Sequence, residues 1–175
     1  YPDKPIVGER VKRSEGFFFK LCYLVHKIIT YTFTGQIIKY GNYSCLPKST
    51  VEKMINEKAI WSSFSGALQK VEKDKVEVPS ERGVRYFGPS KMSFLNLIKH
   101  SLSIISVFKF NVLIRSVLFL VIYLFLISEN ISNITLIPFY LVILLNILTF
   151  YFSNRESIEG LNYSLDNISA VDQIK

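Results

Sequence analysis

Ten residues near the middle of the chain, 82–91, combine side chains suited to binding an anion. They include two arginines, a lysine, a serine and two glycines. A guanidinium group can donate to two phosphate oxygens at once, lysine adds a mobile positive charge, and glycine lets backbone N–H groups approach an anion closely. The segment therefore predicts a phosphate-binding loop, the 82–91 loop, with Arg82, Arg85, Ser90 and Lys91 as its ligands.

Two other interpretations of this loop stay open on composition alone. Basic residues beside a membrane commonly contact lipid headgroups without selecting one ligand. Ser90 can also serve as the N-cap of a helix over residues 92–108, whose N-terminus would itself attract an anion through its dipole. The elements around the loop decide between these interpretations.

The chain after the loop predicts a membrane anchor. Residues 92–108 have an apolar face at helical spacing, which suits a helix packed on a core as well as a helix in the membrane interface; the sequence that follows favours the interface. Two apolar runs follow, 112–127 and 134–152, and each is long enough for a membrane span if the first begins near Phe110. The only charge in the first run is Arg115, which can extend to the headgroups. The expected polar face of 92–108 comprises Asn96, Lys99, His100, Ser103 and Ser106.

The linker 128–133 contains no Lys or Arg, whereas basic residues precede the first apolar run and follow the second. By the positive-inside rule both ends of the hairpin lie in the cytoplasm. The sequence therefore predicts a multi-pass membrane protein with its polar part in the cytoplasm, and the composition suggests a bacterial inner membrane.

The front of the chain predicts an incomplete α/β sheet. Residues 16–33 are expected to form a helix half-buried on a core, because Lys20 and Lys27 would be costly within a bilayer. Short strands are expected at 42–46 and 75–78, and residues 6–7 resemble the end of a strand. Helices are predicted over 49–58, with a capping box of Ser49 and Glu52, and over 61–72.

Charge and composition narrow the function further. Residues 1–111 hold 18 Lys and Arg against 9 Asp and Glu, whereas residues 112–175 hold 3 against 5. A basic N-terminal part followed by an apolar C-terminal part favours anionic lipids or phosphate-bearing substrates as ligands over nucleic acid. Cys22 and Cys45 form no metal pattern and are expected to be reduced core thiols. No P-loop, dinucleotide fingerprint or nucleophile elbow is present.

Three stretches of the sequence resemble one enzyme family. The pattern Arg82-x-x-Arg85-x-x-Gly88-x-Ser90-Lys91, followed by an interfacial helix and a membrane hairpin, is similar to the C-terminal half of membrane-bound family 2 glycosyltransferases. These are the polyprenyl-phosphate type, related to dolichol-phosphate mannosyltransferase. Residues 7–10 resemble the Gly-x-Arg after the donor site of that family, and residues 42–46 resemble a strand of its acceptor region.

The resemblance implies the organisation of the chain. Residues 1–91 would be the acceptor side of a GT-A-like nucleotide-sugar transferase domain, 92–109 the interfacial helix, 110–153 two transmembrane helices and 154–175 a cytoplasmic tail. Arg10 would lie on the donor side. The donor half of the family carries an Asp-x-Asp motif that binds Mg²⁺ or Mn²⁺, and no Asp-x-Asp occurs here. The chain is therefore expected to be part of a longer enzyme and inactive alone.

The implied reaction is an inverting transfer of a sugar from a nucleotide sugar to a polyprenyl phosphate. A phosphate monoester, whose second pKa is near ~6, arrives ionised and needs cations to position it but no general base. A hydroxyl acceptor would need a base, for which only Glu77 or Glu81 can be proposed.

The rival functions are a non-catalytic membrane module that binds anionic lipid headgroups and, last, a nucleic-acid binder. The sequence does not identify the sugar or the catalytic base. It also leaves open whether the chain forms a homo-oligomer.

Overall fold

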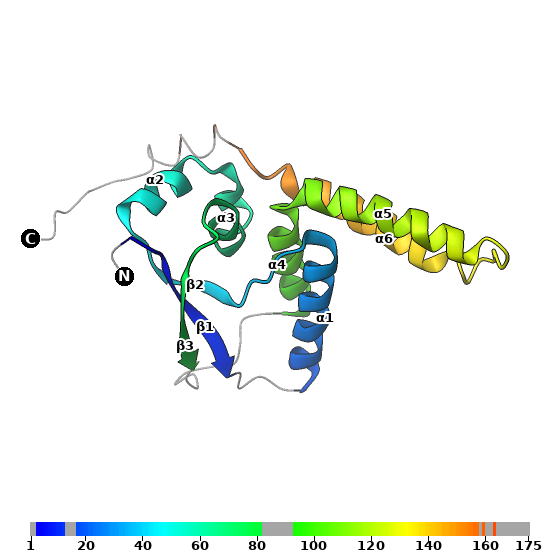
Figure 1. Ribbon diagram of the computed structural model, residues 1–175, viewed down its shortest axis with the longest axis horizontal. Coiled ribbons are helices and arrows are strands. Elements are labelled where there is room, and N and C mark those ends of the chain that lie inside the picture. The colour runs from blue at the N-terminus through cyan, green and yellow to red at the C-terminus, as the bar shows by residue number, and fades with distance from the viewer. Residues whose placement is uncertain (1–2, 13–16, 82–92, 158, 160–162, 164–175) are drawn as a thin grey trace, which may run out of the picture.

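A computed structural model describes residues 3–12, 17–81, 93–157, 159 and 163. In Figure 1 a mixed body of strands and helices carries a helical hairpin that projects to one side. In chain order the elements are β1 (Ile6–Lys12), α1 (Phe17–Thr34), β2 (Tyr40–Cys45), α2 (Lys48–Ile55), the 3₁₀ helix η1 (Lys58–Trp61), α3 (Phe64–Val71), β3 (Val76–Glu81), α4 (Phe94–Ser106), α5 (Lys109–Ile127) and α6 (Ile137–Ser153).

The described sheet has three strands in the order β2-β1-β3. β1 pairs antiparallel with β2 and parallel with β3. The mixed α/β class predicted from the sequence is confirmed, and so are the strands expected near 42–46 and 75–78. The prediction that residues 6–7 end a strand is wrong, because β1 continues through Lys12. Hydrogen bonding to a strand on either side keeps this polar segment extended.

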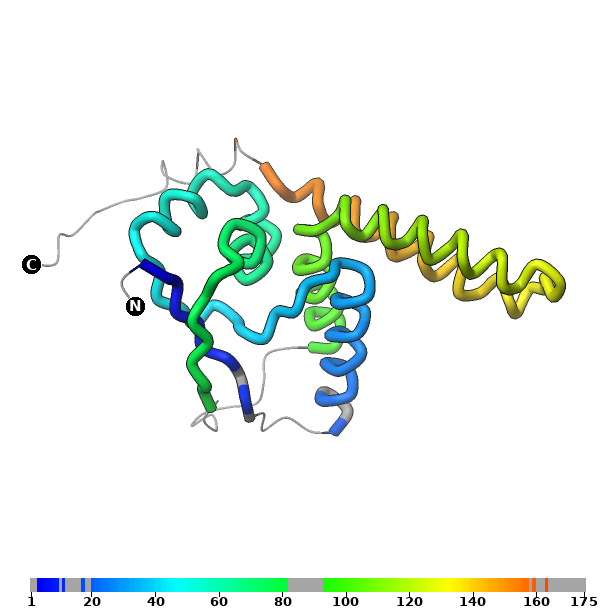
Figure 2. The backbone as a smooth tube through the Cα atoms, in the orientation of Figure 1, coloured from blue at the N-terminus to red at the C-terminus, as the bar shows by residue number. Residues whose placement is uncertain are grey.

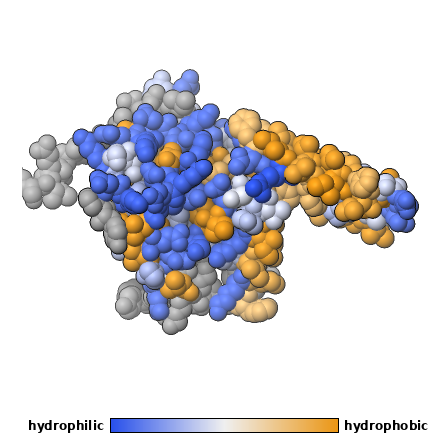
Figure 3. Space-filling model, viewed as in Figure 1, coloured by the Kyte–Doolittle hydropathy of each residue, from blue (hydrophilic) through white to orange (hydrophobic). Residues whose placement is uncertain are grey.

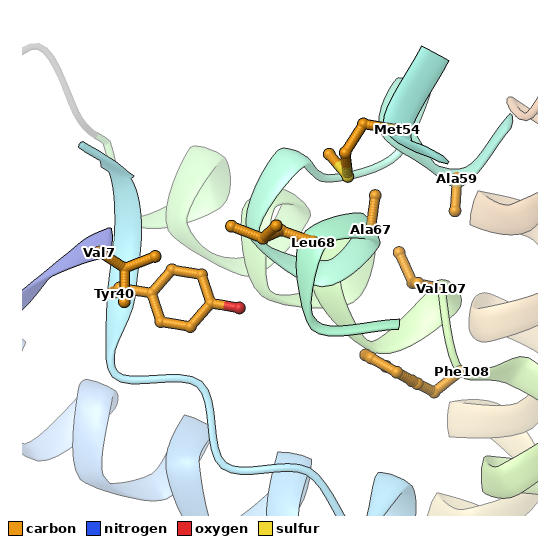
Figure 4. Packing of buried hydrophobic residues seen from close by; sticks show 8 residues of the cluster. All are labelled: Val7, Tyr40, Met54, Ala59, Ala67, Leu68, Val107 and Phe108. Atoms are coloured by element: carbon orange, nitrogen blue, oxygen red, sulfur yellow. The ribbon is translucent and has the colours of Figure 1, made fainter. Parts of the chain in front are cut away.

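The core of the body lies between the sheet and α2, η1 and α3. Figure 4 shows Leu68 of α3 beside Val7 of β1 and the ring of Tyr40 of β2. Val107 and Phe108, at the turn between α4 and α5, extend the same cluster. The core therefore joins the sheet to the base of the hairpin, and burial of these side chains fixes the two parts to each other.

The helix ends differ from the expected ones. α2 begins after Pro47, which makes no side-chain cap, so the predicted capping box of Ser49 and Glu52 is wrong. Ser49 lies within the helix because α2 starts one residue earlier than expected. The helix predicted over 61–72 is shorter in the structure, where Trp61 ends η1 and α3 begins at Phe64. Ser63 caps α3 by accepting a hydrogen bond from the Gly66 N–H.

The amphipathic pattern predicted for α4 holds only at its start. Phe94 and Leu95 are exposed, as an interfacial helix requires. Ser103 and Ser106, expected on a polar solvent face, are buried instead. The second half of α4 packs against α3 and α6, and Ser106 satisfies its hydroxyl group by donating to the Ser103 carbonyl at 3.0 Å. Serine hydroxyls can be buried in a helix because they can bond to its own carbonyls.

α5 and α6 lie side by side along the hairpin, as Figure 2 also shows. Of the described helices, only α5, with 19 residues, is long and apolar enough to cross a membrane. α6 has 17 residues and is shorter than the expected run of 134–152, because Ile134 to Leu136 form turns before it. Pro138 lies in its first turn, where a proline is tolerated.

The contact between α5 and α6 contains more polar residues than the outer surface of the hairpin does, which is the opposite of a helix pair in water. Three of the five residues buried along α5 and α6 are polar, namely Ser116, Thr149 and Ser153, and the other two are Val112 and Val142. The large apolar residues point outward, among them Ile114, Phe125, Leu141 and Ile147. Small and polar residues at the contact, with apolar residues outside, are typical of helices packed within lipid.

A polar junction holds the C-terminus of α1 against α5. Arg115 donates from Nη1 to the Thr32 carbonyl at 3.2 Å, and Asn111 donates from Nδ2 to the Thr34 carbonyl at 3.2 Å. The predicted role of Arg115 was an extension towards headgroups, whereas the structure gives it a partner within the protein. Gly35 follows with φ +72°, a left-handed conformation that ends the helix.

α1 confirms the helix predicted over 16–33, and its inward face packs on α5 and α4. Cys22 in this helix is half-buried and Cys45 of β2 is exposed, and both are free thiols. The prediction of two core thiols is therefore wrong for Cys45. This residue lies at the end of an outer strand of the described sheet, where one face remains open to solvent.

Gly35→Ala is expected to destabilise the fold. An alanine Cβ would lie 2.6 Å from Arg115 Nη2 and would force a left-handed backbone on an L-residue, which costs about 1–2 kcal/mol. The measurement is the free energy of unfolding in detergent micelles, followed by circular dichroism. Gly41→Ala is the control, because Gly41 of β2 has no positive φ. Equal losses in the two variants would contradict this account.

Candidate functional site

The carboxyl ends of β1 and β3 meet at one edge of the sheet. Their parallel pairing runs from Ile6 opposite Val76 to Lys12 opposite Glu81. The 82–91 loop follows Glu81 directly, and the described chain resumes at Ser93, just before α4. Ligands of open α/β sheets bind outside the carboxyl ends of the strands. The topology therefore starts the expected phosphate-binding loop at the edge where such sites occur.

The predicted phosphate ligands themselves lie outside the described residues. This applies to Arg82, Arg85, Ser90 and Lys91, as well as to the side chain of Arg10. The backbone of Arg10 is in β1, opposite Ser80 of β3, two residues before β1 ends. Chain topology thus places Arg10, the residue expected on the donor side, and the start of the expected loop on neighbouring strands.

The first turn of α4 is capped by Ser93, whose side chain accepts a hydrogen bond from the Asn96 N–H at 3.2 Å. α4 begins at Phe94, two residues after the predicted start. The alternative role of Ser90, capping a helix that begins at residue 92, is therefore wrong. A capped helix N-terminus here also directs a positive dipole end towards the segment that precedes it.

A lysine just before β2 links all three strands. Lys39 Nζ lies 3.3 Å from Glu9 Oε1 and 3.5 Å from Glu77 Oε2. The hydrogen bond with Glu9 and the charge of Glu77 raise the pKa of Lys39, so it stays cationic. Glu77, one of the two candidate general bases, is therefore held in an ion pair with Lys39.

Tyr40, the next residue, is buried and serves as an anchor. Its hydroxyl group donates to the Ser65 carbonyl at 3.3 Å or to Gln69 Oε1 at 3.1 Å. Burial raises the pKa of the phenol above its ordinary value, and the charge of Glu77 raises it further. The phenol is therefore a neutral hydrogen-bond donor at physiological pH. Sequence analysis missed this cluster, because only the strand register brings Glu9 and Glu77 to Lys39.

A second polar region is a cavity of about 390 Å³ at the base of the hairpin. Its lining combines four lysines with a single carboxylate, Glu156, which follows α6. The Glu156 side chain is only 5% exposed, and its Oε2 lies 3.9 Å from Lys109 Nζ. Lys109 also donates to Ser153 Oγ at 3.3 Å. The other three lysines are Lys58, Lys70 and Lys73.

The cavity carries cationic side chains that could attract an anion. Lys70 is already paired with Glu57 at 3.0 Å, and Glu156 neutralises part of the remaining charge. The described lining contains no cysteine or histidine and no second carboxylate that could act with Glu156 as an acid–base pair. Sequence analysis counted Lys109 only as a charge flanking a membrane span, and nothing in the sequence pattern placed it near α3.

No cluster of three or more His, Cys, Asp or Glu that could hold a metal occurs within the described part of the chain. Comparison of the sequence and structure with models of known protein families, with curated proteins and with solved structures finds no match.

Glu156 makes stability depend on pH. Burial raises the pKa of its carboxyl group, an effect that Lys109, Lys70 and Lys58 partly offset. The unfolded chain then loses this proton at a lower pH than the folded chain, so stability falls as pH rises from the ordinary pKa towards the raised one. Glu156→Gln removes the titrating group. The unfolding temperature of this variant should therefore vary less with pH across that range than the unfolding temperature of the unmodified protein.

The measurement is thermal unfolding of both proteins in micelles between about pH 4 and 7, a window set by the ordinary carboxyl pKa. Glu52→Gln, on the exposed surface of α2, is the matched control and should follow the unmodified protein. Identical pH profiles for the unmodified protein and Glu156→Gln would show that the carboxylate is not held in a desolvated environment.

Proposed function

We propose that this chain is the acceptor-side and membrane-anchor part of a family 2 glycosyltransferase that moves a sugar from a nucleotide sugar to a polyprenyl phosphate. One observation carries the proposal. The Arg- and Lys-containing 82–91 loop connects the carboxyl edge of the parallel β1–β3 pair to α4, whose first turn is apolar and exposed. A lipid phosphate at this loop would lie between a ligand-binding strand edge and the membrane anchor.

On this proposal α5 and α6 both cross the membrane and the protein is multi-pass. α5 has 19 residues, and α6 has 17, which is at the lower limit of about 17–25 residues for a span. The outward apolar and inward polar residues of the hairpin support its place in lipid. Lys109 and Arg155 lie at its base, whereas the linker 128–133 carries only Glu129 as a charge, which favours a cytoplasmic base.

The chemistry assigned to this chain is positioning of the acceptor. Arg82, Arg85 and Lys91 would bind the phosphate oxygens, and Ser90 would donate a further hydrogen bond. The acceptor is already an oxyanion, so Glu77 can remain paired with Lys39 rather than act as a base. Arg10 would face the donor. The Mg²⁺ or Mn²⁺ that neutralises the nucleotide diphosphate would be bound by residues outside this chain, so the chain alone would not catalyse transfer.

A second candidate function is a non-catalytic module that binds anionic lipid headgroups. The lysine-lined cavity at the base of the hairpin favours it, because that cavity supplies cationic side chains. This function needs no donor half. The two candidate functions differ in lipid selectivity. A cationic surface attracts every anionic headgroup, whereas an acceptor site selects a lipid with a phosphate monoester in the correct position.

The test compares two lipids in nanodiscs that contain the whole chain. Binding of a polyprenyl phosphate and of phosphatidylglycerol is measured for the unmodified protein and for Arg85→Ala and Lys91→Ala. Hydrogen bonds to charged groups contribute roughly 1.5–3 kcal/mol, so each variant should bind the polyprenyl phosphate about tenfold or more weakly. Binding of phosphatidylglycerol should change little.

Lys99→Ala is the matched control, because Lys99 is an exposed cation on α4 outside the loop. It should leave the affinity for polyprenyl phosphate unchanged. Equal losses for both lipids in all three variants would favour the headgroup-binding module and would overturn the acceptor role of the 82–91 loop.

A further inference from the structure

α1 exposes a row of large apolar side chains, whereas the core of the body buries such side chains. Its exposed residues recur three and four positions apart, so they form one stripe along the helix. Within it Phe17 is 82% exposed and Ile28 is 56% exposed. The complete stripe, which we call the α1 stripe, consists of Phe17, Leu21, Leu24, Val25, Ile28 and Tyr31.

The opposite face of α1, which packs on the protein, combines polar residues with the half-buried apolar residues Ile29 and Phe33. Thr30 and Thr34 are buried there, and Thr34 satisfies its hydroxyl group by donating to the Thr30 carbonyl at 2.6 Å. His26 is half-buried on the same face, with Nδ1 3.3 Å from the Thr30 hydroxyl group. A helix whose apolar side faces away from the protein core is not explained by burial within this chain.

Charged residues border the α1 stripe. Lys20 and Lys27 are exposed at one edge of it, and Lys27 lies 5.1 Å from the centre of the Tyr23 ring. Helices that lie in the membrane interface have Lys on the polar side and Phe, Leu or Trp on the other. The long lysine side chains can reach the headgroups while the stripe contacts the acyl chains.

The apolar surface does not end with α1. α1 contacts α4, and Phe94, Leu95 and Ile98 in the first turns of α4 are also exposed. α1 contacts α5 as well, where Phe33 packs edge-on against Phe119 at 6.2 Å between ring centres. Figure 3 shows apolar surface along the hairpin and again along α1, on the side of the body from which the hairpin projects.

The direction of α1 suits a membrane surface. Figures 1 and 2 show α1 and α4 running across the direction of the α5–α6 hairpin. If the hairpin follows the membrane normal, a helix at right angles to it lies in the membrane plane. The contacts of Arg115 and Asn111 with the last carbonyls of α1 hold the helix in that direction.

We propose that α1, together with the first turns of α4, lies in the surface of the lipid bilayer with the α1 stripe at the boundary between headgroups and acyl chains. The occupant of this apolar surface is lipid, because the surface is continuous with the hairpin and is bordered by lysines. The proposal rests on entry of the hairpin into the bilayer, which is part of the proposed function. It adds that the strand edge before the 82–91 loop is held against the membrane by two helices.

The test uses single tryptophans as probes of depth. Trp61 is the only native tryptophan, so Trp61→Phe gives a silent background. Into it are introduced Leu24→Trp in the α1 stripe, Leu118→Trp on the outer surface of α5, and Val51→Trp on α2. All three native residues are exposed, and α2 lies on the side of the body away from the hairpin. The proteins are reconstituted into vesicles with and without brominated phosphatidylcholine.

Brominated chains should quench Leu24→Trp and Leu118→Trp several-fold more strongly than Val51→Trp. Quenching of Leu118→Trp without quenching of Leu24→Trp would overturn the interfacial role of α1 and leave the membrane hairpin intact. Absence of quenching in both would overturn the hairpin as well. Selectivity for polyprenyl phosphate is tested separately by lipid binding. A protein without that selectivity could still show the quenching expected here, so the two tests can fail independently.

A second copy of the chain could instead cover the α1 stripe. In that case the Leu24→Trp emission would shift to shorter wavelength as the ratio of protein to lipid rises, with no response to bromine. That result would also overturn the proposal. Circular dichroism of each variant confirms that its helical content equals that of the Trp61→Phe background before quenching is compared.

Discussion

The junction between α1 and α5 sets the relation between the body and the hairpin. The last carbonyls of a helix have no partners within it. At α1 two of these carbonyls accept hydrogen bonds from Arg115 and Asn111 of α5, and Gly35 then turns the chain away in a left-handed conformation. Because both donors come from one side of α5, α1 is tied to the first turns of the hairpin and not to its tip. The direction of every apolar surface described above depends on this connection.

The body and the hairpin joined at this junction differ in where their apolar residues lie. The hairpin and α1 expose many large apolar residues, and the hydroxyl groups of Thr34, Thr149 and Ser153 donate to carbonyls of their own helices. In the body the order is the usual one, with Leu68, Met54 and Ala67 buried beneath lysine- and glutamate-bearing surfaces. Val107 and Phe108 lie where the body, with its apolar side chains inside, meets the hairpin, with many of its apolar side chains outside.

Local patterns in the sequence were enough to predict the helix at α1 and the long apolar helix α5. They could not predict the full length of β1, whose polar residues are extended only because β2 and β3 pair with it. They also missed the burial of Ser103 and the ion pairs of Lys39, since both require contacts between distant segments. Of the candidate site, the sequence supplied the 82–91 loop, whereas the cavity at Lys109 emerged only from the packing of α3 against the hairpin base.

The parallel pairing of β1 and β3 has a consequence for how the protein folds. α1, β2, α2 and α3 all lie between these two strands in the sequence, so a long stretch of chain must be closed into a loop before the strands can meet. Such closure costs entropy that local contacts do not repay, and folds rich in distant contacts form slowly. We therefore expect the pairing of β1 with β3 to form later than the helices between them. Until it forms, the side of β1 that faces β3 would present unpaired backbone groups on which another extended chain could dock.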